Sequence, residues 1–477
     1  MAAVTERSAI DLAAAIRHRE LTAVDVVSEH IALHRRWAPA INAIVADRYE
    51  QALEEAQTAD AIIAASAEDA ELPPLLGVPF TVKESIALKG MPNAAGLVAR
   101  GGLRMTESAP SAQRLIDAGA IALGVTNTSE LTLWIESENR LYGRTSTPYD
   151  TARTAGGSSG GEGAAVGCGG SPFGLASDIA GSIRIPALFC GVFAHKPTSG
   201  VVPNTGSFPA SHADAGRLLQ SGPIARRAED LMPLLRIVAG PDGVDEHVHK
   251  ADLQDPGSVS LSGLDVVTVE ESFVRDMSQE LRDARERAVG ALVAAGAKVR
   301  SVKLRSWRSA VLPYLATLKT ASGSQSTAEL LVEQGAEPPR LRDLLRRGGP
   351  FTRPTRIALA AERLGDSPAA VARLNSEGHR LAHELIEIVG DGVLLHPAQP
   401  TVAPKHGRTL GQPWLLVPAA MFNLAGLPVT EVPLGLDDRG LPLGVQVAAG
   451  AGRDHVAIAV ALELERVFGG WVPPRPP

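Results

Sequence analysis

Residues 154–198 read TAGGSSGGEGAAVGCGGSPFGLASDIAGSIRIPALFCGVFAHKPT, the densest run of glycine and other small residues in the chain. Glycine is used where the backbone takes φ > 0 or passes close to another group. Three serines lie among these glycines: Ser158, Ser159 and Ser182. Ser182 follows a mostly apolar run, 173–179, and precedes a predicted helix. A strand-to-helix turn of this kind can present a hydroxyl together with unpaired backbone N–H groups.

Other interpretations fit these glycines less well. A Gly/Ser-rich run is typical of a linker, but apolar residues recur here at intervals that a linker does not need. Residues 156–160 fit the G-x-S-x-G elbow of α/β-hydrolases, although the polar segment 150–155 before them is not the apolar strand that the elbow requires. The dinucleotide and phosphate-loop patterns are incomplete. An esterase that uses Ser158 and a downstream histidine stays open as an alternative.

Residues 156–191 resemble the signature of the amidase signature family of serine hydrolases. That family uses a Ser-Ser-Lys triad. The resemblance implies that Ser182 is the nucleophile and that Ser158 is the bridging serine, which follows a cis peptide bond. It implies that Lys83, in the segment GVPFTVKE (77–84), is the buried base.

The same resemblance implies an oxyanion hole made by backbone N–H groups of Ile179, Ala180, Gly181 and Ser182. One departure is visible, because the family commonly has glycine at the position of Ala180. A triad of this kind needs no metal and no cofactor. The histidines at 396 and 406 have no further ligand beside them at metal-binding spacing, so a structural role is expected for both.

The resemblance covers nearly the whole chain. Residues 81–93, 136–144 and 400–406 are most similar to the second type of fatty-acid amide hydrolase, which carries an N-terminal membrane segment in animals. The start of this chain has no such segment, which disfavours a lipid substrate delivered from a membrane. Two alternatives remain open, namely a lipid-amide hydrolase and a subunit of the amidotransferase type.

The composition is that of an ordinary globular protein and argues against several classes. The 477 residues are 45% hydrophobic and 21% charged, and the net charge is −7. A nucleic-acid partner would need a basic patch, and no run approaches the roughly 18 to 20 apolar residues of a membrane span. No secretory signal is visible. We therefore expect a cytoplasmic monomer or homodimer, in which Cys168 and Cys190 are buried thiols.

The alternation of helical and strand patterns predicts an α/β fold, with a mixed central sheet covered on both faces by helices. We expect one domain over 1–477, with a helical, pocket-covering insertion at 309–389. The arginine-rich stretch 340–347 is predicted to be an amphipathic helix. The expected helices are 8–17, 22–34, 49–66, 108–118, 129–134, 227–238, 278–295 and 454–468, and the expected strands are 41–46, 77–83, 121–126, 264–269, 297–302, 393–396, 428–434 and 443–448.

The sequence thus predicts a serine amidohydrolase for a small-molecule amide or carbamate. A neutral Lys83 would draw a proton through Ser158 from Ser182, which would attack the carbonyl. The pocket walls are expected to be mostly apolar, which suits an aromatic or aliphatic substrate. Their candidates are Trp134, Tyr142, Ile179, Gln399, Met421 and Phe422.

Overall fold

The structure is a computed structural model. It describes residues 3–67, 69–210, 213–270, 277–323, 325–337, 340, 349–362 and 367–476. These residues form a central sheet of eleven strands in the order β1-β3-β2-β8-β10-β9-β14-β15-β13-β11-β12. The strands are β1 (Ile44–Asp47), β2 (Pro79–Lys83), β3 (Ile121–Thr126), β8 (Phe173–Asp178), β9 (Phe193–Lys196), β10 (Gln220–Ala225), β11 (Asp265–Val269), β12 (Lys298–Val302), β13 (Val393–His396), β14 (Val429–Leu436) and β15 (Pro442–Ala449).

The sheet is mixed, as expected. β2 lies between β3 and β8 and is parallel to both, and β11 is parallel to β12 and β13. The other pairs are antiparallel. Two short hairpins lie apart from it, one formed by β4 (Glu138–Asn139) and β5 (Gly143–Arg144), the other by β6 (Ser146–Thr147) and β7 (Asp150–Thr154).

Both faces of the sheet carry apolar side chains. Successive side chains of a strand point to opposite faces, so consecutive apolar residues cover both of them. In β13, Val393 and Leu395 pack into the large apolar cluster on one face. Leu394, between them, packs into a second cluster on the other face. A sheet buried on both faces needs a helical layer on each, and the sequence pattern predicted this architecture.

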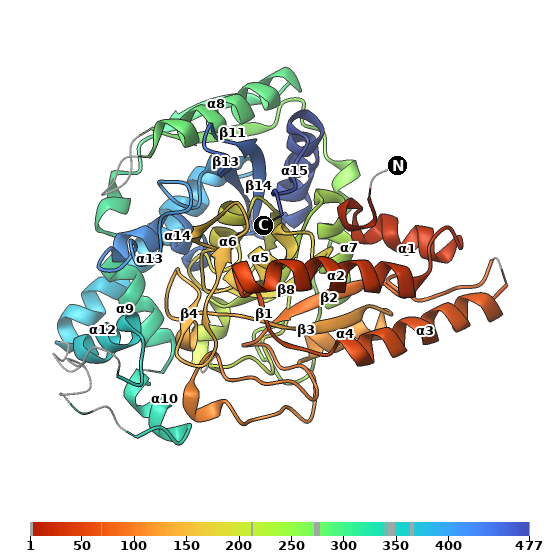
Figure 1. Cartoon of the computed structure of the whole chain (residues 1–477). Helices are drawn as coiled ribbons and strands as arrows, with labels where there is room; N and C mark the ends of the chain where they lie inside the picture. The colour runs from red at the N-terminus through yellow and green to blue at the C-terminus, as the bar shows by residue number, and fades with distance from the viewer. Residues whose placement is uncertain are drawn as a thin grey trace.

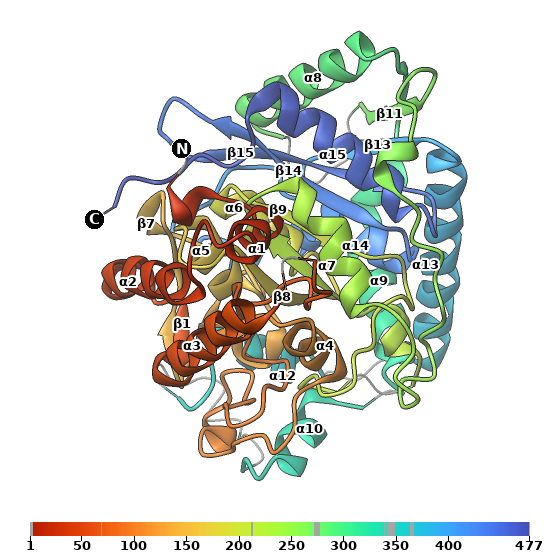
Figure 2. The same ribbon diagram turned by 90° about the vertical axis from the view of Figure 1, so that its right-hand side faces the viewer.

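Helices cover both faces and extend beyond the sheet (Figures 1 and 2). α4, α7, α8 and α15 contribute to the large cluster, whereas α13 and α14 contribute to the second. The helices are α1 (Ala9–Arg17), α2 (Ala23–Ile41), α3 (Tyr49–Ala65), α4 (Pro110–Asp117), α5 (Gly160–Gly167), α6 (Arg184–Cys190), α7 (Leu231–Val238), α8 (Gln279–Ala294), α9 (Val311–Ala321), α10 (Thr327–Glu333), α12 (Arg353–Glu362), α13 (Pro368–Val389), α14 (Val417–Leu424) and α15 (Asp454–Phe468).

The N-terminal helices begin at the residues that the sequence indicates. The Ser8 hydroxyl accepts a hydrogen bond from the backbone N–H of Asp11, and the Thr22 hydroxyl accepts one from that of Asp25. Such caps satisfy N–H groups that have no partner within a helix. Figure 1 shows α1, α2 and α3 on one side of the molecule.

All regular elements described in the segment 309–389 are helices, and turns and loops join them. Its helices α9, α10, α12 and α13 lie on the side of the molecule away from α1 to α3 (Figure 1). α13 packs against both α9 and α14. The helix predicted over 340–347 falls almost wholly outside the described residues.

The helix expected at 129–134 is wrong. The chain forms only a 3-10 turn at Glu130–Thr132, in which Leu131 and Thr132 have φ values of 54° and 58°. The backbone N–H of Leu131 donates to the carbonyl of Ala95 instead of to its own helix. A tertiary contact therefore overrides the local helical pattern of this segment. The resulting turn places Trp134 beside the helical segment 309–389, with which it lines one pocket.

Candidate active site

Lys83 is the last residue of β2, and its side chain is fully buried. Its Nζ donates to Ser158 Oγ at 2.7 Å and to Ser177 Oγ at 3.0 Å. Ser177 lies in β8, the strand paired with β2, so the sheet itself places the ammonium or amine group beside these hydroxyls. The fully buried side chain of Lys83 therefore does not reach water at the edge of the sheet.

The surroundings of Lys83 favour its neutral form. Burial lowers the pKa of Lys83 to about 7, although the negative charges of Asp178 and Glu162 act in the opposite direction. Burial also raises the pKa of Glu162 to about 8, against hydrogen bonds from Thr81 and Thr126. Because burial favours the neutral form of Glu162, the opposing effect of this carboxyl group on the lysine is weakened.

Ser158 stands at the start of α5 and is almost fully buried. The peptide bond between Gly157 and Ser158 is cis, as the resemblance implied. The N–H of the next residue, Ser159, donates to the carbonyl of Ser182 at 3.2 Å. This bond ties the two serine segments together, although no hydrogen bond in the described part of the chain joins the Ser158 and Ser182 hydroxyls directly.

The loop that carries Ser182 is shaped by a buried carboxylate. β8 ends at Asp178, whose oxygens accept from the N–H groups of Gly181 at 2.7 Å and Ile183 at 3.0 Å. Gly181 has φ 106°, a conformation that side chains disfavour, and a Cβ there would lie 2.5 Å from Cβ of Ala419. The turn therefore requires glycine at 181.

Arg184 holds Asp178 in place from the first turn of α6. The two side chains form a fully buried ion pair at 3.0 Å. Burial alone would raise the pKa of Asp178, but the Arg184 guanidinium keeps it well below its usual range. The side-chain oxygens of Asn423 and Gln446 accept the other guanidinium hydrogens. A buried pair with all its polar groups bonded rigidly positions the loop above it.

One of the four predicted oxyanion-hole donors is used elsewhere. The N–H of Gly181 points to Asp178, so it is not available to a substrate. The N–H groups of Ile179, Ala180 and Ser182 make no hydrogen bond with any residue that the structure describes. Unpaired amides of this kind, next to a serine hydroxyl, can stabilise a developing oxyanion.

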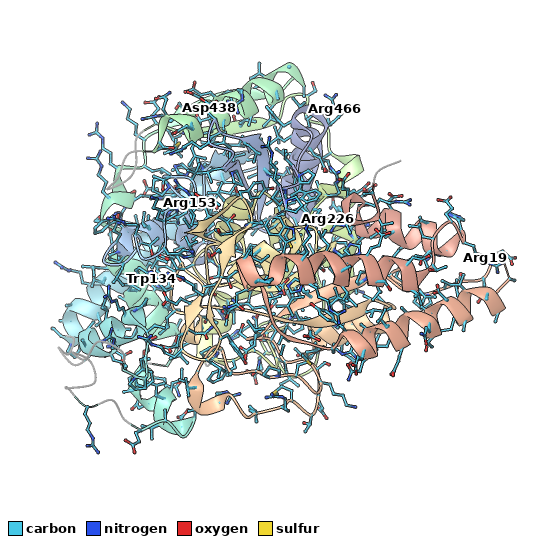
Figure 3. The ribbon with its side chains drawn as sticks, in the orientation of Figure 1. Arg19, Trp134, Arg153, Arg226, Asp438 and Arg466 are labelled. Carbon is cyan, nitrogen blue, oxygen red and sulfur yellow. The ribbon has the colours of Figure 1, made fainter. Side chains whose placement is uncertain are left out.

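A pocket of about 270 Å³ opens beside Ser182. Of the predicted wall residues, Trp134 and Ile179 line it, as does Ala180. Figure 3 labels Trp134 within the surrounding side chains. The helical segment 309–389 also lines this pocket through α9 and α10, whose lining side chains are Tyr314, Leu315, Leu318, Thr327 and Leu330.

Four predicted wall residues lie elsewhere, which corrects that part of the prediction. Met421 and Phe422, both in α14, are fully buried in the apolar cluster that α14 forms with α13. Tyr142 donates its hydroxyl to Glu84. Gln399 donates its amide to the carbonyl of Leu415 and borders a separate cavity. Apolar or polar character alone does not say which side of an element faces a pocket.

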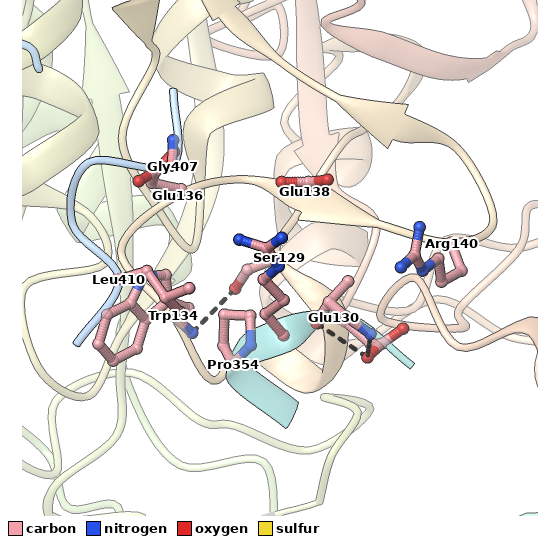
Figure 4. A pocket seen from close by; sticks show the side chains of 11 residues that line it. Ser129, Glu130, Trp134, Glu136, Glu138, Arg140, Pro354, Gly407 and Leu410 are labelled. Carbon is pink, nitrogen blue, oxygen red and sulfur yellow. Dashed lines mark hydrogen bonds between the residues drawn. The ribbon is translucent and has the colours of Figure 1, made fainter. Parts of the chain in front are cut away.

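A second pocket, of about 280 Å³, also has Trp134 in its wall (Figure 4). Its polar wall includes Glu136, which accepts from the N–H groups of Gly407 and Thr409. The indole N–H of Trp134 donates to the Thr409 hydroxyl at 2.8 Å. Trp134 is therefore held in position by the 407–409 loop and lines both pockets.

Sequence reasoning did not assign roles to Ser177, Glu162, Asp178, Arg184 or Tyr314. The sequence did contain a signal that Glu162 has a special role, since it is the one charged residue in the run of small residues 154–170. Asp178 also had one, as the charged end of a buried apolar strand. Ser177 and Tyr314 had none, because only the fold brings them to the site.

The cysteines and histidines that the structure describes do not form a metal-binding cluster. Cys168 and Cys190 are buried free thiols, as expected, and burial raises the pKa of Cys168 to about 12. His406 contacts the Ser146 hydroxyl, and His396 contacts the carbonyl of Pro397. The described residues include no group of three metal-ligating side chains. None of the described helices combines the length and the apolar character needed to cross a bilayer.

Comparison with known proteins connects this geometry to a family. The family model described as Amidase matches residues 25–457. The chain is 40% identical to Fatty-acid amide hydrolase 2 of Homo sapiens over 98% of its own length and 90% of that protein. It is 30% identical to a Glutamyl-tRNA(Gln) amidotransferase subunit of a Nostoc species, over 94% and 95% of the two chains. The solved structure of 6-aminohexanoate cyclic dimer hydrolase complexed with substrate superposes with a TM-score of 0.83, at 25% identity and 99% coverage of both chains.

Proposed function

This chain belongs to the Amidase family, and from that premise we propose that it hydrolyses small-molecule amides with Ser182 as nucleophile, Ser158 as proton bridge and Lys83 as base. The contact that carries the proposal is the 2.7 Å hydrogen bond between Lys83 Nζ and Ser158 Oγ. It lies in a buried environment where burial brings the pKa of Lys83 to about 7. A base with a pKa near the working pH is the one best suited to proton transfer.

The proton moves in two linked steps. Neutral Lys83 accepts the proton of Ser158, and Ser158 in turn accepts that of Ser182, whose Oγ attacks the substrate carbonyl. The N–H groups of Ile179, Ala180 and Ser182 stabilise the resulting oxyanion. When the C–N bond breaks, Ser158 returns a proton to the leaving nitrogen, and water then hydrolyses the acyl-enzyme by the same route. Since the two serine hydroxyls share no hydrogen bond among the described contacts of the free protein, substrate binding must bring them together.

The pocket indicates the kind of substrate. Its volume of about 270 Å³ is slightly below the roughly 300–1,000 Å³ of small-molecule sites. Its walls are mainly aliphatic and aromatic, including Trp134, Leu318 and Leu330. We expect small to medium acyl groups with aryl or alkyl leaving groups. Carbamates present the same planar carbonyl and a nitrogen leaving group, so they belong to the proposed range.

A fatty-acid amide is the second candidate substrate. It is supported by the 40% identity to Fatty-acid amide hydrolase 2 and by the leucines that α9 and α10 contribute to the pocket wall. An amidotransferase-type role has weaker support, because glutamine carries charged groups that this wall does not match. All three positions of the proposed triad are filled, which suits a self-sufficient hydrolase.

Kinetics on a matched substrate panel test the proposal. We expect kcat/KM for hexananilide and for an aryl carbamate to equal or exceed that for oleamide, and Ser182→Ala to abolish all three activities. A preference of more than about a hundredfold for oleamide, corresponding to about 2.7 kcal/mol, would favour the second candidate. Hydrolysis of glutamine alone would favour the amidotransferase type. Full activity in Ser182→Ala would reject Ser182 as the nucleophile.

A further inference from the structure

Tyr314 joins the helical insertion to the loop that carries the nucleophile. It lies in α9, only 2% of its surface is exposed, and it lines the same pocket as Ser182. Its hydroxyl donates to the carbonyl oxygen of Ile179 at 2.6 Å. Its ring packs in an apolar cluster with Ala180 and Ala420. Tyr314 therefore contacts the proposed oxyanion loop through both its ring and its hydroxyl.

The orientation of one peptide unit follows from this bond. In a trans peptide the C=O and N–H groups point in opposite directions. Since Tyr314 holds the carbonyl of Ile179, the N–H of Ala180, which belongs to the same unit, points away from Tyr314. That N–H has no hydrogen-bond partner among the described residues.

The rest of the loop is anchored from the opposite side. Asp178 accepts from the N–H groups of Gly181 and Ile183, and Ser159 donates to the carbonyl of Ser182. None of these bonds involves the peptide unit between Ile179 and Ala180. Without the Tyr314 hydroxyl this unit could turn, and its carbonyl oxygen would then face the charge that develops on the substrate.

We propose that Tyr314 is a positioning residue for the oxyanion hole, which holds the Ile179 carbonyl so that the Ala180 N–H stays directed at the developing negative charge. The inference rests on the proposed function of Ser182. It gives the insertion a part in the reaction beyond covering the pocket, since its first helix completes the oxyanion loop. Burial raises the pKa of Tyr314 far above its ordinary value, so the hydroxyl remains a hydrogen-bond donor over the whole working range of pH.

The variant Tyr314→Phe tests this by removing only the hydroxyl. Losing a direct oxyanion-hole donor lowers kcat by about 10² to 10³. A donor that stays present but is less well oriented should lose less, so we expect kcat to fall about tenfold to thirtyfold, with KM within about twofold of wild type. Rates are expressed per Ser182 site titrated to completion with a fluorophosphonate, so incomplete folding does not alter the result.

Tyr149→Phe is the matched control. The hydroxyl of Tyr149 also donates to a backbone carbonyl, that of Val472 at 2.5 Å, but it lies outside the site. We expect its kcat to match wild type. A general effect of losing a tyrosine hydroxyl that donates to a backbone carbonyl would lower kcat in both variants, and that outcome would overturn the proposal.

An inhibitor pair separates positioning from a structural role. A trifluoromethyl ketone forms a tetrahedral oxyanion on Ser182, whereas the secondary alcohol with the same carbon skeleton cannot. In Tyr314→Phe the Ki of the ketone should rise by the factor by which kcat/KM falls, and the Ki of the alcohol should not change. Equal changes for both inhibitors, or a kcat within threefold of wild type, would overturn the proposal. If instead Ser182→Ala were fully active, the proposed function itself would fail.

Discussion

The assignment of Lys83 as the base leads to a quantitative prediction for the pH dependence of the reaction. Burial brings the pKa of Lys83 from 10.5 to about 7. The difference corresponds to about 5 kcal/mol between the two protonation states. At pH 7 about half of the lysines are then neutral, whereas an ordinary lysine would be neutral in roughly one molecule in 3,000. At pH 5 the neutral fraction falls to about 1%, so kcat/KM should fall about tenfold per pH unit below pH 7.

A pH profile alone does not identify the group, because the structure holds a second buried lysine with the same property. Burial also lowers the pKa of Lys196 to about 7, and its Nζ contacts only the carbonyl of Pro197 among the described hydrogen bonds. Lys196→Met is therefore the matched control for Lys83→Met. We expect Lys83→Met to lose about 10² to 10⁴ in kcat/KM. Lys196→Met should keep both the wild-type kcat/KM and its decrease below pH 7, the acid limb of the profile.

Thermal unfolding separates lost catalysis from lost structure. Between pH 10.5 and pH 7 the unfolded chain protonates Lys83 while the folded chain does not, so this lysine lowers stability as the pH falls through that window. Lys83→Met removes the penalty and should melt at pH 7 no lower than wild type. The reasoning would be refuted if Lys83→Met kept more than a tenth of the activity, or if Lys196→Met abolished the acid limb.

Three further predictions concern the nucleophile and its loop. A fluorophosphonate should give an adduct that mass spectrometry maps to Ser182, and Ser158→Ala should slow the labelling without moving it. Gly181→Ala should destabilise the fold and lower the rate of labelling, because side chains disfavour a φ of 106° and the methyl group would collide with Ala419. A melting temperature equal to wild type would contradict this prediction. Arg184→Met should cost about 3–5 kcal/mol in the free energy of unfolding measured with denaturant, since it leaves a buried carboxylate unpaired. The exposed pair of Arg466 gives its control, because Arg466→Met should leave the free energy of unfolding almost unchanged.

The regular elements were predictable from the sequence because their signals are local. The caps at Ser8 and Thr22 act on N–H groups three residues away. The alternation of buried side chains along β13 follows from strand geometry alone. The turn at Glu130–Thr132 was not predictable in this way, since the bond from Leu131 to the carbonyl of Ala95 joins residues that are far apart in the sequence.

The sequence by itself determined the α/β class, the family resemblance and the identities of Lys83, Ser158 and Ser182, because these depend on residue types and their order along the chain. Only the tertiary structure decided what surrounds them. Pairing of β2 with β8 brings Lys83 to Ser177 across 94 positions, and α9 brings Tyr314 to Ile179 across 135 positions.

The same holds for the pocket walls. In α14, Ala419 lies next to Gly181, whereas Met421 and Phe422 point into the apolar cluster under α13. Apart from Asn423 this helix is apolar, and a helix without a polar face gives no indication of its orientation. Which residues reach the substrate is therefore set by the rotation of the helix about its axis, and only packing against the neighbouring elements fixes that rotation.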